Sequence, residues 1–165
     1  MASRVDQFAS HPGVVFDCNV FLQAVAKGGN RAYGCLQLVT DGEVTLYMSD
    51  DCLAEIDEVL RRPELRAIFP MLTDERVDAL IELMRDVAVF LDPVPHIFDY
   101  PPDVTDEPYI DLAIAAGAVF LVSWDKHIRN LGNPDHADGR RLQEGHPGVA
   151  IMDPGEFLRE YYKAG

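Results

Sequence analysis

Cysteine is scarce in this sequence, and neither a disulfide framework nor a zinc site is indicated. The three cysteines, Cys18, Cys35 and Cys52, are odd in number and match no Cys-x-x-Cys or Cys/His zinc spacing. We therefore expect three free thiols, as is usual in the reducing environment of the cytoplasm.

Long apolar runs and positive charge are scarce as well. No run approaches the roughly 18 apolar residues that a membrane span needs, and residues 1–13 lack the charged and apolar regions of a signal peptide. The 14 Lys and Arg residues stand against 28 Asp and Glu residues, which gives a formal net charge of −14. So acidic a protein does not attract phosphates by a general positive field. We expect a soluble cytoplasmic protein whose contacts with any nucleic acid are local or metal-mediated.

The length of the chain and the spread of its hydrophobic residues fit one domain. The 165 residues are 48% hydrophobic, which is enough for a sizeable core. We expect residues 1–12 to be an N-terminal extension and residues 13–165 to form a single domain. No internal repeat divides the sequence.

Strand-like and helix-like segments alternate along the chain. Short apolar strands are predicted at residues 14–16, 44–48, 87–91, 119–122 and 149–151. Apolar residues at helical spacing predict helices at residues 20–39 with a break at 28–30, 50–62, 73–85, 106–116 and 153–162. The proline-rich segment 92–105 is predicted to be a loop, and the polar segment 133–147 to be irregular and mobile. This alternation predicts an α/β fold, a three-layer α/β/α sandwich with a mainly parallel central sheet.

Four acidic residues are predicted to meet at one edge of this sheet. Asp17 ends the first strand and Asp125 follows the fourth, beyond the carboxyl ends of strands, where open α/β sheets bind ligands. Glu55 and Asp106 lie in the first turns of helices, where the helix dipole alone would favour an acid. Each acid by itself is readily explained as a cap or a solvated residue. Four together repel one another unless a cation neutralises them, and an all-oxygen ligand set selects Mg²⁺ or Mn²⁺. Such a site suits metal-assisted hydrolysis of a phosphodiester.

Five short segments of the chain carry a family pattern. They are VVFDCNV at 14–20, SDDCLAEIDEVL at 49–60, DEPYIDLA at 106–113, LVSWDK at 121–126 and MDPGEFL at 152–158. In this order they resemble the PIN-domain family, in the VapC-like branch that is described as toxins of toxin–antitoxin systems. The resemblance covers about residues 13–160, nearly the whole chain.

The resemblance implies a PIN fold and endoribonuclease activity that depends on Mg²⁺ or Mn²⁺. It assigns metal binding and catalysis to Asp17, Glu55, Asp106 and Asp125. Supporting roles fall to Asn19, Ser123 and Glu107. Whether Asp106, Glu107 or Asp103 is the third acid stays open. Lys126 and Arg129 follow the last acid directly and are candidates for binding RNA phosphates. The implied partners are an RNA substrate, a cognate antitoxin protein and a second copy of the chain in a homodimer, with no membrane.

Three positions depart from the family pattern. Cys18 stands where Thr or Ser is usual, Trp124 replaces a small or charged residue and is expected to pack, and His127 occupies a position that tends to be acidic. Cys18 and His127 motivate an alternative, a catalytically weak PIN-like module that binds RNA or protein. A haloacid-dehalogenase-like phosphatase is disfavoured because it needs an Asp where this chain has Asn19. The five histidines show no ligand spacing, so we expect them on the solvated surface.

Overall fold

Five parallel strands form the central sheet of the computed structural model, which describes residues 11–164. The strands are β1 (Gly13–Phe16), β2 (Thr45–Met48), β3 (Val89–Phe90), β4 (Phe120–Val122) and β5 (Ala150–Met152). Their order across the sheet is β3-β2-β1-β4-β5, so β1 lies at the centre and the chain extends the sheet first to one side and then to the other. All neighbouring strands pair in parallel, and the predicted α/β fold with a parallel sheet is confirmed.

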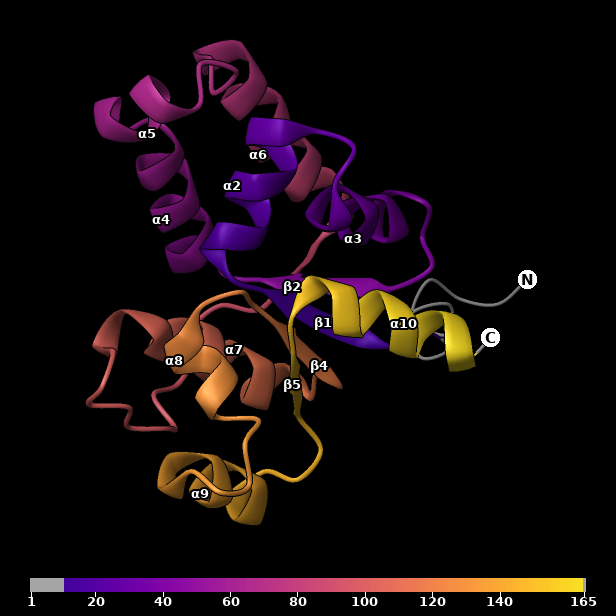
Figure 1. The fold of residues 1–165 in the computed structure, drawn as a ribbon, viewed down its shortest axis with the longest axis vertical. Helices are drawn as coiled ribbons and strands as arrows, with labels where there is room; N and C mark the ends of the chain where they lie inside the picture. The colour runs from indigo at the N-terminus through magenta and orange to yellow at the C-terminus, as the bar shows by residue number, and fades with distance from the viewer. Residues whose placement is uncertain (1–10, 165) are drawn as a thin grey trace.

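Helices lie on both sides of the sheet, as Figure 1 shows. One side carries α2 (Cys18–Lys27), α3 (Arg31–Thr40), α4 (Asp50–Leu60), α5 (Pro63–Ile68) and α6 (Asp74–Val87). The other side carries the 3₁₀ helix η1 (Val104–Asp106), α7 (Glu107–Ala116), α8 (Lys126–Asn130) and α9 (Ala137–Gly145). The last helix, α10 (Pro154–Ala164), packs on α3 and on β4 and β5. The result is the three-layer sandwich that the alternation of elements predicts.

Polar caps and glycines set the ends of the helices. Ser49 and Thr73 accept hydrogen bonds from the backbone N–H groups three residues later, at 3.1 and 3.3 Å, and so begin α4 and α6. Gly28 and Gly29 separate α2 from α3, with φ angles of 60° and 62° in the left-handed region that favours glycine. Asn30 then caps α3. The predicted break in this helical stretch is confirmed.

Aromatic side chains fix the carboxyl end of β1. The ring of Phe16 lies 6.0 Å from the ring of Phe21 and 6.0 Å from that of Phe157, centroid to centroid. Phe120 of β4 also contacts Phe157, at 5.4 Å. Phe16, Phe21 and Phe157 are each at most 1% exposed, and full burial of such a side chain stabilises the fold by about 1.5–3 kcal/mol. The residue that follows Phe16 is therefore presented from a rigid base.

The prediction of an irregular, mobile segment at 133–147 was wrong, because α9 occupies most of it. Tertiary contacts hold this helix. Leu142 is 1% exposed, and the backbone at Gly139 packs so closely that a Cβ there would lie 2.2 Å from the carbonyl oxygen of Asn133. A short polar sequence with two glycines carries no local signal of these contacts.

Two further boundaries differ from the prediction. The third strand was expected at 87–91, but α6 continues to Val87 and leaves only Val89–Phe90 in the sheet. Pro63 does follow the end of α4, but it also occupies the first turn of the short helix α5, a position where its missing N–H costs nothing.

The cysteines and the helix lengths bear on two predictions made from the sequence. The three cysteines are buried and free, as predicted. Within residues 11–164, no helix has both the length and the apolar character that crossing a membrane requires.

Candidate functional site

The carboxyl ends of β1 and β4 lie side by side at the centre of the sheet. Phe16 pairs with Val122, so the residues that follow, Asp17 and Ser123, are neighbours. Ser123 Oγ donates a hydrogen bond to Asp17 Oδ2 at 2.7 Å. β2 and β4 lie on opposite sides of β1 in the sheet. The carboxyl end of β1 is therefore the topological switch point, the place at which open α/β sheets bind ligands.

Asp17 is buried, and both of its carboxylate oxygens accept hydrogen bonds. Its Oδ1 accepts from the N–H of Cys18 at 2.6 Å, and its Oδ2 accepts from Ser123. Burial raises the pKa of Asp17 to about 6; these two hydrogen bonds oppose the rise, while the charges of Asp125 and Glu55 add to it. Each oxygen keeps a further lone pair. Asp17 can therefore still bind a cation.

Ser123, directly after β4, and Asn19, in the first turn of α2, are two of the predicted supporting residues, and they tie the loop after β4 to the chain that follows β1. Ser123 Oγ accepts a hydrogen bond from the N–H of Asp125 at 2.9 Å. Asn19 Oδ1 accepts one from the N–H of Trp124 at 3.3 Å. The Trp124 side chain is half-buried and packs against the hydrophobic core, as predicted.

Asp106 is the least satisfied carboxylate of this region. The residue is 5% exposed, it stands at the N-cap of α7 without a capping hydrogen bond, and its Oδ2 has no hydrogen-bond partner among residues 11–164. Burial raises the pKa of Asp106 to about 8, and the charges of Asp17, Asp125 and Asp103 add to the rise. A buried polar atom without a partner costs about 1–3 kcal/mol. A cation at this oxygen would remove that cost.

Asp103, Asp125 and His127 lie around Asp106. One potential ligand atom from each of these four residues lies within 4.8 Å of all the others. Asp125 Oδ1 accepts a hydrogen bond from the backbone N–H of His127 at 2.7 Å, which caps α8. His127 Nδ1 lies 3.3 Å from Asp103 Oδ2. We refer to these four residues as the acid–histidine group.

Glu55 and Asp17 border the acid–histidine group. Glu55 is half-buried on α4, and its Oε1 accepts a hydrogen bond from Tyr109 Oη of α7 at 3.2 Å. Burial raises the pKa of Glu55, and the hydrogen bond from Tyr109 lowers it. Of the four predicted acids, the structure brings Asp106 and Asp125 together in the acid–histidine group, and Asp17 and Glu55 lie outside that group. The charges of Asp125 and Glu55 both raise the pKa of Asp17.

Glu107 makes a different set of contacts. Its Oε1 accepts a hydrogen bond from the N–H of Tyr100 at 2.7 Å, and its carboxylate groups with His96 and Asp99 rather than with the acid–histidine group. Of the three residues considered for the third acid, Asp106 and Asp103 therefore lie in the acid–histidine group and Glu107 does not.

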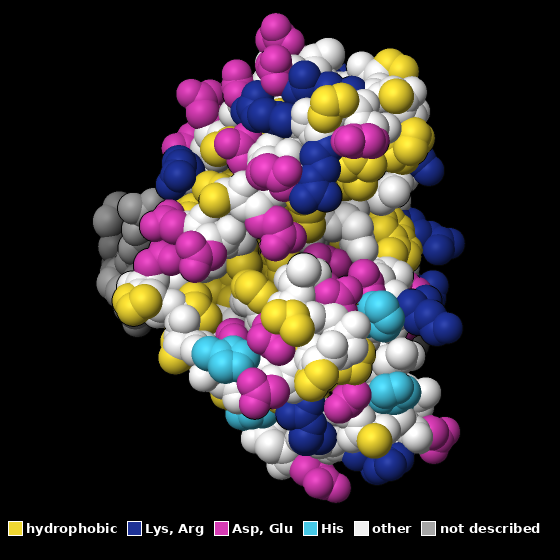
Figure 2. Space-filling view, turned by 90° about the vertical axis from the view of Figure 1, so that its left-hand side faces the viewer, with side chains coloured by type: hydrophobic (Ala, Val, Ile, Leu, Met, Phe, Trp, Pro, Cys, Tyr) yellow, Lys and Arg dark blue, Asp and Glu magenta, His cyan; other side chains and the backbone are white. Residues whose placement is uncertain are grey.

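Both predicted phosphate-binding residues, Lys126 and Arg129, line a cavity of about 330 Å³, and none of the four predicted acids lines it. Arg129 lies 3.7 Å from Asp153 and 3.7 Å from Glu156. Lys126 forms no ion pair with any residue that the structure describes. On the face drawn in Figure 2, acidic side chains and a histidine gather near the middle, and Lys and Arg side chains lie around them.

These donors fit a divalent cation. The acid–histidine group offers three carboxylates and one imidazole, and the unpartnered Oδ2 of Asp106 is a buried acceptor that can bind a cation. Neither the contact of Tyr109 with Glu55 nor that of His127 with Asp103 was predicted from the sequence. Tyr109 stands in the DEPY segment, and His127 follows Asp125 by two residues, but neither spacing by itself indicates a contact with the acids.

Known proteins resemble the chain over the region that contains these residues. A family model described as a PIN domain matches residues 13–127, which include Asp17, Glu55 and the whole acid–histidine group. The chain is also 24% identical over 150 residues to the uncharacterized protein MJ1680 of Methanocaldococcus jannaschii, across 91% of this chain and 92% of that protein.

Proposed function

The chain belongs to the PIN-domain family, whose members are generally metal-dependent nucleases, and from this premise we propose that it is a metal-dependent endoribonuclease. One observation carries the proposal: the unpartnered carboxylate oxygen of Asp106, buried beside the charges of Asp17 and Asp125 at the switch point of the sheet. Carboxylates buried so close together are stable in their ionised form when a cation lies between them.

In this proposal the cofactor is a divalent metal ion. The four predicted carboxylates form an all-oxygen ligand set, which favours Mg²⁺ or Mn²⁺. The ion would be held by Asp17, Glu55, Asp106 and Asp125. Such an ion lowers the pKa of a bound water and stabilises the charge of a phosphodiester under attack. The protein's part is to hold the carboxylates in place: Ser123 orients Asp17, and Tyr109 orients Glu55.

RNA would contact the protein through local cations. Lys126 is exposed on the wall of the cavity, next in sequence to Asp125, and is not engaged by an acid of the described chain. Its ammonium group can approach a phosphate while the ion in the site approaches the next one. Arg129, on the same wall, would help once it exchanges its 3.7 Å contacts with Asp153 and Glu156 for a phosphate. Local contacts of this kind suit a protein with a net charge of −14.

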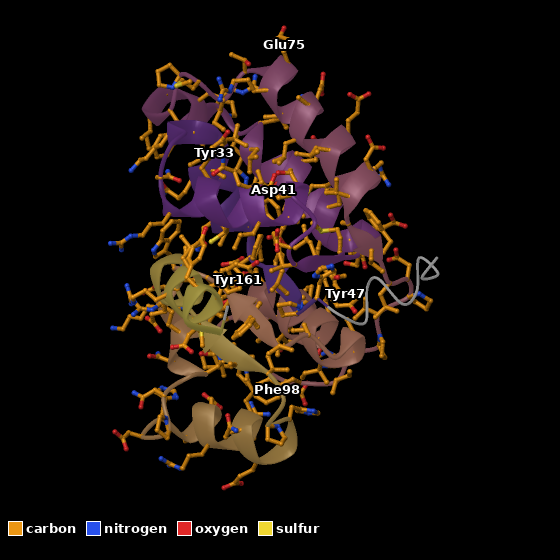
Figure 3. The ribbon with its side chains drawn as sticks, turned by 90° about the vertical axis from the view of Figure 1, so that its right-hand side faces the viewer. Tyr33, Asp41, Tyr47, Glu75, Phe98 and Tyr161 are labelled. Atoms are coloured by element: carbon orange, nitrogen blue, oxygen red, sulfur yellow. The ribbon has the colours of Figure 1, made fainter. Side chains whose placement is uncertain are left out.

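The proposal is tested with purified protein and a mixed single-stranded RNA in Mn²⁺, in Mg²⁺ and in EDTA, alongside an Asp17→Asn variant. The control is Asp41→Asn, which removes one negative charge on the opposite side of the molecule, the side that Figure 3 faces. We expect metal-dependent cleavage that Asp17→Asn abolishes and Asp41→Asn retains. Metal binding without any cleavage would instead favour a PIN-like binding module.

We further propose that the nuclease is the cytoplasmic toxin of a toxin–antitoxin pair. The acidic surface supports a partner with a Lys- or Arg-rich segment that covers the site, because opposite charge speeds and orients association. Expression of the chain should then arrest growth, and co-expression of the product of a short adjacent reading frame should restore it. Growth arrest that Asp17→Asn does not relieve would contradict this role.

A further inference from the structure

His127 places an imidazole nitrogen among the carboxylates of the site. Its Nδ1 lies 3.3 Å from Asp103 Oδ2 and 3.8 Å from Asp125 Oδ1. The backbone of His127 is fixed on both sides, because its N–H donates to Asp125 Oδ1 at 2.7 Å and its carbonyl accepts from the buried Tyr100 Oη at 2.7 Å. The ring is thus held next to the acids by the fold.

Asp103 is oriented toward this ring by its own neighbours. Its Oδ1 accepts hydrogen bonds from the N–H and the hydroxyl of Thr105, at 3.1 and 2.6 Å, which leaves Oδ2 to face His127. Asp103 and His127 come from a loop and from α8, which are separated by the whole of α7 and β4. The structure therefore brings a carboxylate from a distant part of the chain to the half-exposed ring of His127.

A second observation, independent of the clustering of acids, points to a ligand at this place. Asp106 is 5% exposed, and its Oδ2 is unpartnered among the described residues. One of its carboxylate oxygens belongs to the group of atoms that lie within 4.8 Å of one another. Ligand atoms bound to one cation at about 2.0–2.2 Å lie no more than about 4.4 Å apart, so the group needs only a small contraction to share one ion.

We propose that His127 is a direct ligand of the bound cation, and that the site therefore selects a first-row transition-metal dication over Mg²⁺. This inference deepens the proposed nuclease function and rests on it. Imidazole nitrogen suits Zn²⁺, Co²⁺, Ni²⁺ and Fe²⁺, whereas Mg²⁺ is bound by oxygen ligands. His127 would add a nitrogen to Asp106 and Asp125, which the proposed function already assigns to the ion and which share the acid–histidine group with it. The all-oxygen argument for Mg²⁺ does not apply to such a mixed set.

The test is a binding experiment on the full chain that does not depend on RNA cleavage. Wild type, His127→Asp and a control, His146→Gln, are loaded with Mn²⁺, and electron spin-echo modulation reports whether a nitrogen nucleus is bound to the ion. His146 lines a separate cavity with Gly117 and Val149. We expect the nitrogen signal in wild type and in His146→Gln, and its loss in His127→Asp.

Equilibrium dialysis supplies the second readout. In His127→Asp the affinity for Co²⁺ should fall at least about tenfold while the affinity for Mg²⁺ does not fall, because loss of even an outer partner of a ligand costs about 10–100-fold. The His127 side chain is 50% exposed, so the substitution leaves the core intact, and circular dichroism checks this.

The outcomes separate the two proposals. Mn²⁺ binding without a nitrogen signal, or equal selectivity in wild type and His127→Asp, overturns the inference and leaves the nuclease proposal standing. Absence of any divalent-ion binding by wild type overturns both. A nitrogen signal together with no RNA cleavage supports the role of His127 and contradicts the nuclease proposal.

Discussion

Two carboxylates five residues apart are equally buried but differ in their hydrogen-bond partners. Asp106 and Asp111 are each 5% exposed. Asp111 Oδ1 accepts hydrogen bonds from the backbone N–H groups of Ile97 and Phe98, at 3.0 and 2.9 Å, and its Oδ2 lies 2.8 Å from His96 Nδ1. The Oδ2 of Asp106 has no such partner within residues 11–164. A fold that satisfies one buried acid so fully leaves the other available for a ligand.

Asp111, whose hydrogen bonds are satisfied, positions the loop that leads to Asp106. By binding two backbone N–H groups, Asp111 holds the loop between β3 and η1 against α7. Phe98 of this loop also lies under the guanidinium of Arg141 on α9, 3.9 Å from the ring centroid, and Figure 3 shows Phe98 beside that helix. The same loop carries Asp103. The structural acid therefore sets the geometry of the candidate site without taking part in it.

Neutralising each of the two acids in turn tests whether their roles differ, and the largest effect is expected for Asp106→Asn. RNA cleavage should fall at least about hundredfold, because the several kcal/mol that a metal ion contributes are lost with its ligand. The free energy of unfolding should not fall, since the amide replaces a carboxyl that is forced to keep its proton in the folded protein. Single-turnover cleavage and urea unfolding measure the two effects. A variant that retains activity would exclude Asp106 from the chemistry.

Asp111→Asn should show the reverse pattern. It removes a charge that accepts two backbone hydrogen bonds and contacts His96, and hydrogen bonds to charged groups contribute about 1.5–3 kcal/mol each. We expect the free energy of unfolding to fall by about 2–3 kcal/mol, with metal affinity changed less than in Asp106→Asn. Urea unfolding and equilibrium dialysis check this. Loss of metal binding without loss of stability would mean that Asp111 belongs to the site.

The places of Asp17 and Asp125 could be predicted from the sequence because the sheet does most of the positioning. Asp17 and Asp125 each follow a short apolar run, and parallel strands that are neighbours bring their carboxyl ends together. The wider fold follows from the same alternation of strands and helices. Helix α9 could not be predicted, because its stability comes from Leu142 and the close contact at Gly139, which are tertiary.

The different roles of Asp106, Glu107 and Asp111 could not be read from the sequence either. All three lie within six residues, and Asp106 and Glu107 stand at the start of α7, where acids are favoured for any function. Only the loop that folds back over α7 decides which carboxylate meets backbone N–H groups and which does not. His127 is exposed, as expected, but its contact with Asp103 could not be predicted, because Asp103 comes from that loop.

The stability of the metal-free protein should fall as the pH rises, and Asp106 should account for part of the fall. Burial raises its pKa from 3.8 to about 8. Between these values the folded protein keeps a proton that the unfolded chain has released, so the free energy of unfolding decreases with rising pH until about pH 8. Asp17, with a pKa of about 6, acts in the same direction.

Urea unfolding in EDTA at about pH 5.5 and about pH 8.5 measures this effect, which we expect to reach at least about 1 kcal/mol. His96 loses its contacts with Asp99 and Asp111 over the upper part of the same range, because those contacts raise its pKa to about 9. The difference between wild type and Asp106→Asn isolates the carboxylate from this background. Parallel pH profiles for the two proteins would show that Asp106 is not repelled in the folded state.

The smallest predicted effect concerns Ser123, the hydroxyl between Asp17 and Asp125. Ser123→Ala removes two hydrogen bonds and should lower the free energy of unfolding by about 1 kcal/mol. Because the Ser123 hydroxyl lowers the pKa of Asp17, its removal should raise that pKa and shift the acid limb of the pH–cleavage profile to higher pH. Ser49→Ala, which removes the cap of α4, is the matched control: it should cost a similar amount of stability without moving the profile. If both variants left the profile in place, Ser123 would be a purely structural residue, and the distinction between satisfied and unsatisfied acids would not extend to Asp17.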